Sequence, residues 1–492
     1  MLPCLIHSLS ILMKTLFGLY GYSGEHTPPK FGDFEAQRHW MELTTNIPVS
    51  DWYKNSTENS DKYWPMDYPP MSGYHSYLCG LFFKLFLPES VQLISSHGYE
   101  NPLHKILMRF ISLMSDICIF HVSAHLLLKQ IYKKNNNKFI FSLFMVLMSP
   151  CLSIIDHGHF QFNNVMHGFF LLSVYFLLQN HVIFAIISYS MCILFKQMGL
   201  YYAIPFPLIA FKMLRIKNTN IQIIIKLGIF AVTTVLSFLI FLFPWIYPKL
   251  KISEILIRVF PTWRGIFEDK VATFWCTLNI FYKIKQIKQT IIMKLSLLCT
   301  LTGCFIPIIC LLYMKKIRKK IIFLSFFIMS LSFYLFSFHV HEKTIIVPYL
   351  AYLLCYYQLN QFLMSFTLMA MFSMKPMLER ENQVFTYGIS TIMFCLLCLL
   401  IKGGETNSIK ETQSKKTKMF QIMETLFKLI DVACVCGVVL YHIGEKYIKP
   451  PTRYPYFYPM INGAFSFCYF IFLFGYSSLR IIYISFKFDK NN

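Results

Sequence analysis

The chain has 492 residues, of which 55% are hydrophobic and 14% are charged, and its mean hydropathy is +0.50. Soluble globular proteins carry about 25% charged residues. The composition therefore excludes a water-soluble enzyme, a disordered protein and a disulfide scaffold, and it predicts an all-α polytopic membrane protein. The formal net charge is +22. Because lysine and arginine concentrate in the cytosolic loops of membrane proteins, this charge predicts a chain set in a lipid bilayer, with no nucleic acid partner.

Fourteen apolar segments are candidate transmembrane helices, for which about 20 apolar residues are needed. The first is interpreted as a retained span and not as a signal peptide, because it lacks a small-residue cleavage site. The segments lie near residues 2–21, 106–128, 138–155, 165–179, 181–196, 200–214, 221–244, 291–313, 320–338, 344–357, 361–374, 385–401, 427–444 and 460–484.

The loops between these segments are of two alternating kinds. One kind is basic and is expected in the cytosol. The other kind carries carboxylates, histidines and all six tryptophans, and with a cytosolic N-terminus it falls entirely on the opposite side. The basic stretch 283–294 is the exception, and an interfacial amphipathic helix is the alternative there. The expected order is a first helix (1–21), a large non-cytosolic loop (22–105), helices 2–7 (106–244), a second such loop (245–290), helices 8–12 (291–401), a cytosolic loop (402–426), and helices 13–14 with a short tail (427–492).

The first non-cytosolic loop holds the run GDFEAQRHW and, further on, DYPP. Asp33 and Glu35, with Arg38 close by, follow the first span at the height of a lipid head group. A carboxylate there can act as a general base if it reaches a hydroxyl. The alternative is a solvated loop acid or a helix cap. Asp67 precedes Tyr-Pro-Pro, whose stiff backbone can hold the carboxylate in place, or the segment is an ordinary turn.

Three further polar segments lie on the same predicted side. The first, DHGHFQFN, contains His159 and Gln161; it is a candidate pocket wall, a metal site or a polar hairpin. The second, RGIFEDK, contains Glu268 and Asp269, which suit sugar hydroxyls or form a surface charge cluster. In the third, FHVHEK, ionisable groups join two apolar spans, a placement that indicates function. The sequon at Asn55 is a candidate glycosylation site.

Several of these stretches occur together in one known family. The segments GDFEAQRHWMELT, DYPP, HGHFQFN, FKQMGLYY, RGIFEDKVATFWC and FHVHEK, in this order, resemble the endoplasmic-reticulum glucosyltransferases of the lipid-linked oligosaccharide pathway. The resemblance covers roughly residues 15 to 460. Within the family, GDFEAQRHW and the Gly-Tyr-His-Ser after DYPP favour the member that adds the first glucose over the paralogue that adds the second.

The resemblance implies a GT-C fold in the endoplasmic-reticulum membrane, with a luminal active site. The implied donor is dolichyl phosphate glucose and the implied acceptor is an oligosaccharide on dolichyl diphosphate. Transfer inverts the anomeric centre without a metal or other cofactor, and the lack of a phosphate-binding glycine loop fits a donor that is not a nucleotide. The residue roles implied are Asp33 as catalytic base, Asp67 as a second acid, Glu268 and Asp269 in the luminal cleft, His341 and Lys343 at the donor phosphate, and Glu35, Arg38, His159 and Gln161 as further substrate contacts.

A transporter or scramblase is the competing class, since it would also have many spans and charges within the membrane. Such proteins usually show two similar halves, and the sequence shows no such repeat. A transporter would also not need a long acidic and aromatic first loop.

Overall fold

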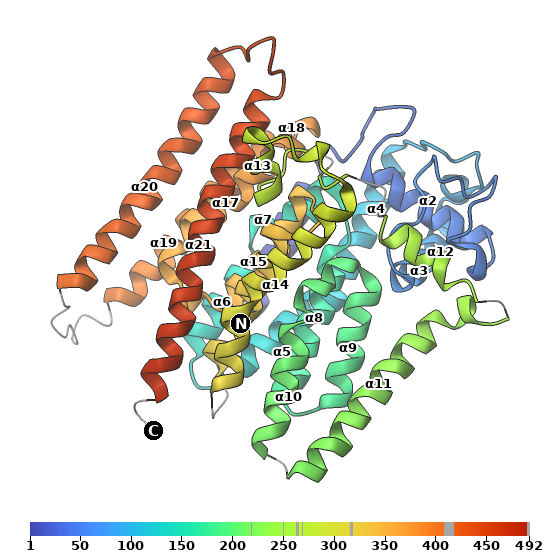
Figure 1. Ribbon diagram of the computed structural model, residues 1–492. Coiled ribbons are helices and arrows are strands. Elements are labelled where there is room, and N and C mark those ends of the chain that lie inside the picture. The colour runs from blue at the N-terminus through green and yellow to red at the C-terminus, as the bar shows by residue number, and fades with distance from the viewer. Residues whose placement is uncertain are drawn as a thin grey trace. The chain divides into compact units, whose positions relative to one another are not determined.

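The computed structural model describes residues 1–217, 219–248, 250–261, 265–267, 269–314, 318–407 and 418–489. Within these ranges the regular structure is entirely helical (Figure 1). The chain divides into two compact units. The first contains residues 1–148, 152–263 and 380–383, and the second contains residues 149–151, 264–379 and 384–492.

The helices of the first unit run from the N-terminus to residue 259. Helix α8 packs along α9 and α5, α9 packs on α11, and α2 packs on α3. The α-helices are α1 (Leu2–Phe17), α2 (Asp33–Asn46), α3 (Pro70–Phe86), α4 (Pro102–Ser115), α5 (Val122–Ile131), α6 (Asn136–Leu147), α7 (Pro150–Ile154), α8 (Asn163–Leu178), α9 (Val182–Phe195), α10 (Pro205–Lys217), α11 (Asn220–Ile246) and α12 (Ile252–Val259). Two π-helical segments, Asp116–His121 and Ile155–Phe160, interrupt this series.

The second unit is built around α15, which packs on α14, α16 and α21. Helix α17 packs on α19, α20 and α21. The α-helices of this unit are α13 (Phe274–Phe281), α14 (Gln289–Tyr313), α15 (Lys319–Phe336), α16 (Ile346–Leu354), α17 (Leu363–Ser373), α18 (Lys375–Arg380), α19 (Val384–Asn407), α20 (Lys418–Tyr447) and α21 (Phe457–Asp489).

Eight helices among the described residues are long and apolar enough to cross a membrane. They are Pro102–Ile131, Asn136–Phe160, Asn220–Ile246, Gln289–Tyr313, Lys319–Phe336, Val384–Ile401, Thr425–Tyr447 and Phe457–Phe486. Shorter apolar helices lie at Leu2–Phe17, Asn163–Leu178 and Val182–Phe195. The expected count of fourteen spans stays a prediction, although each expected apolar segment coincides with a helix over most of its length.

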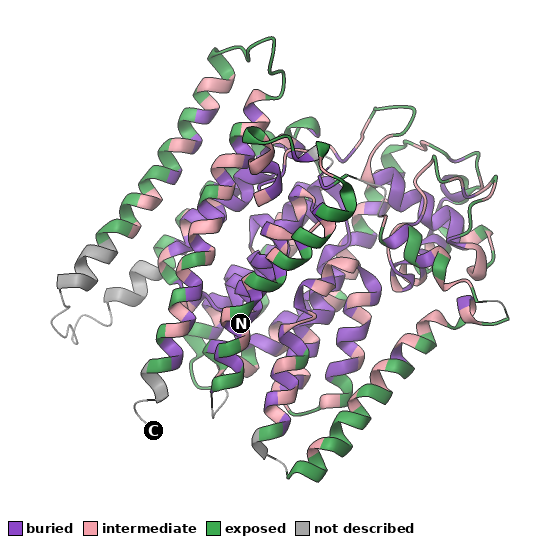
Figure 2. Cartoon of the chain, viewed as in Figure 1, coloured by how far each residue is buried: buried purple, intermediate pink, exposed green. Residues whose placement is uncertain are grey.

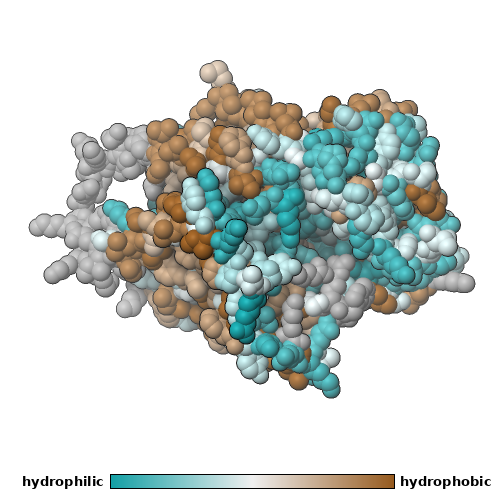
Figure 3. All heavy atoms as spheres, turned by 90° about the horizontal axis from the view of Figure 1, so that it is seen from above, coloured by the Kyte–Doolittle hydropathy of each residue, from teal (hydrophilic) through white to brown (hydrophobic). Residues whose placement is uncertain are grey.

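Several of the long helices expose apolar side chains. Figure 2 shows α11 and α20 as largely exposed, and along α11 the exposed residues include Ile221, Ile224 and Val232. Seen from above, wide hydrophobic areas of the surface adjoin hydrophilic ones (Figure 3). Water would not tolerate such continuous apolar faces, whereas the hydrocarbon of a bilayer does.

The first predicted loop, 22–105, is a folded layer. Its aromatic side chains form a core with the end of α11 and with α12, in which Trp52 and Trp245 are fully buried. Helix α3 begins at Pro70 because proline has no N–H to lose at the first helical position. The stiff DYPP segment therefore places Asp67 and Tyr68 directly before a helix.

Candidate active site

Asp33 is the first residue of α2, and its backbone is fixed by the segment that precedes it. The Asp33 N–H donates to the Ser23 hydroxyl at 3.1 Å, and the Ser23 N–H donates to the carbonyl of His159 at 3.0 Å. Gly32 permits this approach, because a Cβ there would lie 2.5 Å from atoms of Ser23. A carboxylate in the first turn of a helix is also stabilised by the helix dipole.

Two side chains from a distant segment hold the Asp33 carboxylate. His159 Nε2 lies 2.9 Å from Asp33 Oδ2, and the Gln161 amide N–H donates to the same oxygen. The Asp33 side chain keeps 22% of its surface exposed, whereas that of His159 keeps 4%. The carboxylate is therefore positioned by protein groups and still accessible to a substrate.

The local backbone explains how His159 and Gln161 reach one oxygen. Residues two apart on a helix do not face each other. Here the π-helical segment ends at Phe160, whose φ of 86° lies in the left-handed region, and Gln161 is extended. Alternate residues of an extended chain share a face. Strained residues and π-helical turns both concentrate at functional sites.

Glu381 completes the contacts of His159. Its Oε1 lies 2.5 Å from His159 Nδ1, so each ring nitrogen faces a carboxylate. Both nitrogens can donate at once only in the imidazolium form. The set Glu381–His159–Asp33 can therefore hold a proton between two carboxylates.

Lys196 and Tyr68 orient Gln161 from its other side. The Lys196 ammonium donates to Gln161 Oε1 at 2.9 Å, and the Tyr68 hydroxyl donates to the same oxygen at 3.1 Å. The ammonium also lies 4.2 Å from the centre of the Tyr68 ring. Burial raises the pKa of the Tyr68 phenol, and the negative charges of Asp33 and Asp67 raise it further. Tyr68, which follows Asp67 in the chain, therefore contacts the amide that holds Asp33.

The side chains of the histidine-rich segment before Gln161 bind different partners. Asp156 accepts from the backbone N–H groups of Asn163 and Asn164 and so caps α8. His157 Nε2 instead lies 3.0 Å from Asp116 Oδ2. Neither residue contacts Asp33 through a hydrogen bond among the described residues. The alternative of a metal held jointly by these side chains therefore has no support in their arrangement.

Glu35 and Arg38 lie in a buried ion-pair network. Arg38 is fully buried and binds the two oxygens of Glu35 at 2.6 Å each. It also donates to the Ser96 hydroxyl at 2.6 Å, while Tyr63 donates to Glu35 at 2.7 Å. These contacts join α2 to residues 63–98. Substrate binding by Glu35 and Arg38 stays a prediction. Their contacts also fix the loop residues 63–98 against α2.

Glu42 is the second carboxylate of this network. Burial on its own would raise its pKa, but the hydrogen bond from His39 and the charge of Arg38 outweigh burial and lower the pKa to about 2. His39, Glu42 and His97 offer possible metal-ligand atoms within 4.8 Å of one another. The same carboxylate already accepts from Arg38 at 2.7 Å and from the Ile94 N–H at 2.7 Å, so we assign the cluster to the ion-pair network.

Of the remaining predicted substrate-binding residues, Asp269, His341 and Lys343 belong to the second unit, and Glu268 lies outside the described residues. Within this unit, His339 donates its N–H to Ile266 and its ring lies 2.9 Å from the carbonyl of Gly265. Gly265 and Ile266 therefore lie against His339. His341 is the N-cap of a short 3-10 helix, Glu342–Ile345, that contains Lys343.

Asn55, the sequon residue, is exposed, and its side-chain oxygen accepts from the N–H of Asp61 at 3.3 Å. An exposed asparagine is sterically accessible to modification. Its glycosylation stays a prediction.

Sequence reasoning missed several buried ionic groups. Lys14 in α1 donates to Asp116 at 2.5 Å, with both side chains at most 2% exposed, and His121 lies 2.9 Å from the same ammonium. Both charges interrupt apolar segments, and this signal could have identified them. No local signal marks Glu381, because its partner His159 is 222 positions away in the sequence.

Together these features define a class of protein. The helices suit a bilayer, and the first unit presents an accessible carboxylate supported by a histidine and an amide. Such a carboxylate can accept a proton from a hydroxyl that attacks an electrophile. The helices therefore define a polytopic membrane protein, and the site suits transfer of a group to a hydroxyl.

Comparison with known proteins identifies the family. The model of the ALG6, ALG8 glycosyltransferase family matches residues 10–476. A relative from Arabidopsis thaliana, named probable dolichyl pyrophosphate Man9GlcNAc2 alpha-1,3-glucosyltransferase, is 36% identical over 95% of this chain and 87% of its own. Relatives with the same activity in their names are 35% identical in Schizosaccharomyces pombe (99% and 92% covered) and 32% identical in Gallus gallus (97% and 96%).

The chain belongs to the ALG6, ALG8 glycosyltransferase family. It is a multi-pass membrane glycosyltransferase, and the predicted all-α GT-C class is confirmed.

Proposed function

We propose that the protein transfers the first glucose from dolichyl phosphate glucose to Man9GlcNAc2 on dolichyl diphosphate, in alpha-1,3 linkage. The accessible Asp33 carboxylate, held by His159 and Gln161, carries the proposal. The activity in the names of relatives that cover nearly the whole chain supports the choice of acceptor and linkage.

The reaction is a single displacement. The 3-hydroxyl oxygen of the acceptor mannose attacks C1 of glucose, and the bond from C1 to the phosphate oxygen breaks. The hydroxyl proton passes to Asp33, and dolichyl phosphate leaves with the bonding electrons as an anion. Attack from the opposite face converts the beta-linked donor into an alpha-linked product. A sugar hydroxyl is a poor nucleophile, so a positioned base accelerates its attack by about 100- to 10,000-fold.

The leaving phosphate needs compensation for its growing negative charge. His341 and Lys343 are the proposed cationic contacts, and Glu268 and Asp269 are the proposed sugar contacts of the same cleft. Asp67, Glu35 and Arg38 complete the proposed substrate-binding set. The proposed site lies on the luminal side of the endoplasmic-reticulum membrane.

Two acceptors test the proposed step. The purified full-length protein in lipid vesicles is supplied with synthetic dolichyl phosphate glucose and either the unglucosylated or the monoglucosylated acceptor. Transfer to the unglucosylated acceptor alone is expected. Transfer only to the monoglucosylated acceptor would identify the paralogous second step, and movement of substrate without transfer would identify a transporter.

Asn55 tests the orientation. If the 22–105 loop is luminal, an N-glycan on Asn55 is expected to shift the protein in a gel, and the shift should disappear in Asn55→Gln or after deglycosylation. A second sequon engineered into the same loop gives an independent reading. Failure of that sequon to be modified, while one engineered into 402–426 is modified, would contradict the luminal assignment.

A further inference from the structure

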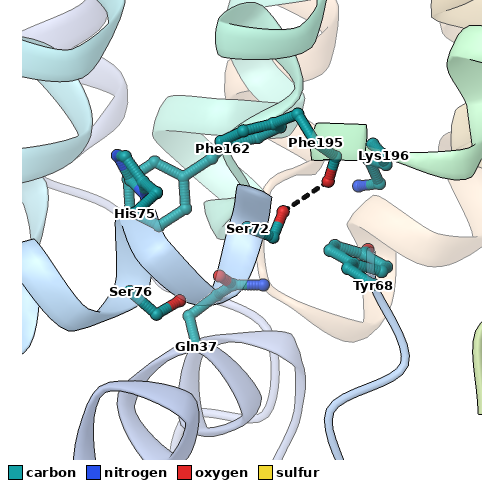
Figure 4. Close-up of a pocket in the computed structure, with 8 residues that line it drawn as sticks. All are labelled: Gln37, Tyr68, Ser72, His75, Ser76, Phe162, Phe195 and Lys196. Carbon is teal, nitrogen blue, oxygen red and sulfur yellow. Dashed lines mark hydrogen bonds between the residues drawn. The ribbon is translucent and has the colours of Figure 1, made fainter. Parts of the chain in front are cut away.

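A small pocket in the first unit adjoins the Asp33 site. Its walls come from α2 and α3, from the segment before α8 and from the end of α9, and they include Gln37, Tyr68, Ser76 and Lys196 (Figure 4). Tyr68 and Lys196 both donate to the Gln161 oxygen, and Gln161 donates to Asp33. The Gln161 side chain therefore links two residues of the pocket wall to the proposed base.

Gln37 and Ser76 have unused hydrogen-bonding capacity in this pocket. Both are buried, at 4% and 3% exposed, and neither side chain forms a hydrogen bond within the described part of the chain. Figure 4 shows the two side chains next to each other on one wall. Neither is among the fully enclosed unpaired polar groups of the described residues, so the polar atoms of both side chains are open to the pocket that they line. A bound group that donates to and accepts from both side chains would supply the missing partners.

The other polar groups of the pocket are already occupied. The Ser72 hydroxyl donates to the Phe195 carbonyl, and His75 Nε2 lies 2.9 Å from the Ser115 hydroxyl. Burial also lowers the pKa of the His75 imidazole to about 4, so this ring is neutral near pH 7. The free capacity is thus concentrated in one neutral amide and one hydroxyl.

The chemistry of the walls suits a sugar. The rings of Tyr68 and Phe162 supply apolar surface, while Gln37 and Ser76 supply one amide and one hydroxyl. Ligand sites combine apolar walls with a few placed polar groups in this way. The space admits about one water-sized group, so a hydroxyl or hydroxymethyl arm of a hexose fits, whereas a whole ring does not.

We propose that Gln37 and Ser76 bind one hydroxyl or hydroxymethyl group of a hexose and thereby select the sugar that reacts beside Asp33. The inference rests on the proposed glucosyl transfer. The hexose is either the transferred sugar or the terminal acceptor sugar, since both must lie next to the base. The role is one of specificity, because neither side chain forms a hydrogen bond to Asp33 among the described residues.

Deoxy substrates test this assignment. Donors that lack one glucose hydroxyl at a time, and acceptors that lack one hydroxyl of the terminal mannose at a time, are assayed with the full-length protein in lipid vesicles. One compound is expected to react at least about 100-fold more slowly with the wild type, because the loss leaves the amide and hydroxyl unpaired. Whether that compound is a donor or an acceptor identifies the source of the bound group.

The variants Gln37→Leu and Ser76→Ala complete the test. Each variant is expected to transfer glucose about 10- to 100-fold more slowly than the wild type with the intact substrates. The sensitive deoxy compound should lower the rate of each variant little further, because the variant already lacks the interaction with the missing hydroxyl. Gln92→Leu, an exposed glutamine of the same loop, is the matched control and should show the wild-type deoxy profile.

Three outcomes decide the assignment. If removal of a hydroxyl slows the wild type and both variants by the same factor, the assignment is overturned, and water is the remaining occupant of the pocket. If Gln37→Leu does not fold, Ser76→Ala carries the same comparison, because it removes only one oxygen. If the wild type transfers no glucose to the unglucosylated acceptor, the proposed function itself has failed, which is distinct from transfer without a selective deoxy effect.

Discussion

Asp33→Asn is the substitution that most directly tests the proposed chemistry. Asparagine has nearly the same shape, and its side-chain oxygen can still accept from His159 or Gln161, the two groups that hold Asp33 Oδ2. The helix start at Gly32 and the Ser23 contact involve backbone atoms and should persist. The change therefore removes the proton acceptor while it preserves the surrounding geometry.

The expected loss follows from the role of a general base. Such a base contributes about 100- to 10,000-fold, which corresponds to about 3–5 kcal/mol of activation free energy. Because the base acts in the transition state, kcat should fall by this factor while KM changes little. Asp33→Glu keeps a carboxylate but displaces it, so an intermediate rate is expected.

The assay measures glucosyl transfer under single-turnover conditions in lipid vesicles, so that product release does not mask the chemical step. Thermal unfolding of each variant confirms that it is folded. Glu89→Gln is the matched control, because Glu89 is an exposed carboxylate of the same loop. A folded Asp33→Asn protein that works within threefold of the wild-type rate would refute the role of Asp33 as the base.

Three further substitutions test the groups around the base and the buried charges. Glu381→Gln should lower kcat about 10- to 100-fold and alter the pH–rate profile, because His159 loses the carboxylate that orients it; an unchanged profile would contradict this positioning role. For Glu42, the folded-state pKa of about 2 lies below the ordinary 4.5, so its stabilisation is complete above pH 4.5 and is lost as the pH falls through about 2. Thermal unfolding of Glu42→Gln should therefore be less acid-sensitive than that of the wild type between pH 5 and 3, by about 2 kcal/mol over this interval. Asp116→Asn should cost about 3–5 kcal/mol by leaving Lys14 buried without a counter-charge, whereas the double variant Lys14→Met/Asp116→Leu should recover most of that stability; equal stability of single and double variants would exclude a buried ion pair.

Much of the helical framework could be predicted from the sequence, because the apolar segments are long and the bilayer demands such lengths. The first loop illustrates the limit of that reasoning. Trp40, Trp52 and Trp245 stand out by residue type, yet only the fold shows that they form one core with α12. A non-cytosolic loop rich in tryptophan predicts an interface or a binding site equally well.

The site was predictable in part. Asp33, His159 and Gln161 lie in motif segments, and the structure brings them together. Lys196 also lies in a quoted segment, FKQMGLYY, but its charge follows an apolar run with no pattern that links it to Gln161. In the chain, Glu381 comes directly after a long stretch of the second unit, but it belongs to the first unit. No sequence pattern indicates this placement, because it is set by tertiary structure alone.

Residues that are neighbours in one motif can have different partners in the fold, as the segment from Asp156 to Gln161 shows. Asp156 caps α8 and His157 binds Asp116, while His159 and Gln161 turn to Asp33. Phe160, whose left-handed conformation lies between His159 and Gln161, allows both of these side chains to reach the same Asp33 oxygen. A strained residue persists only where its surroundings hold it, and here an anchored cap and an ion pair lie on one side of it. The buried charges of the first unit thus hold the turn from which the histidine and the amide reach Asp33, the proposed base.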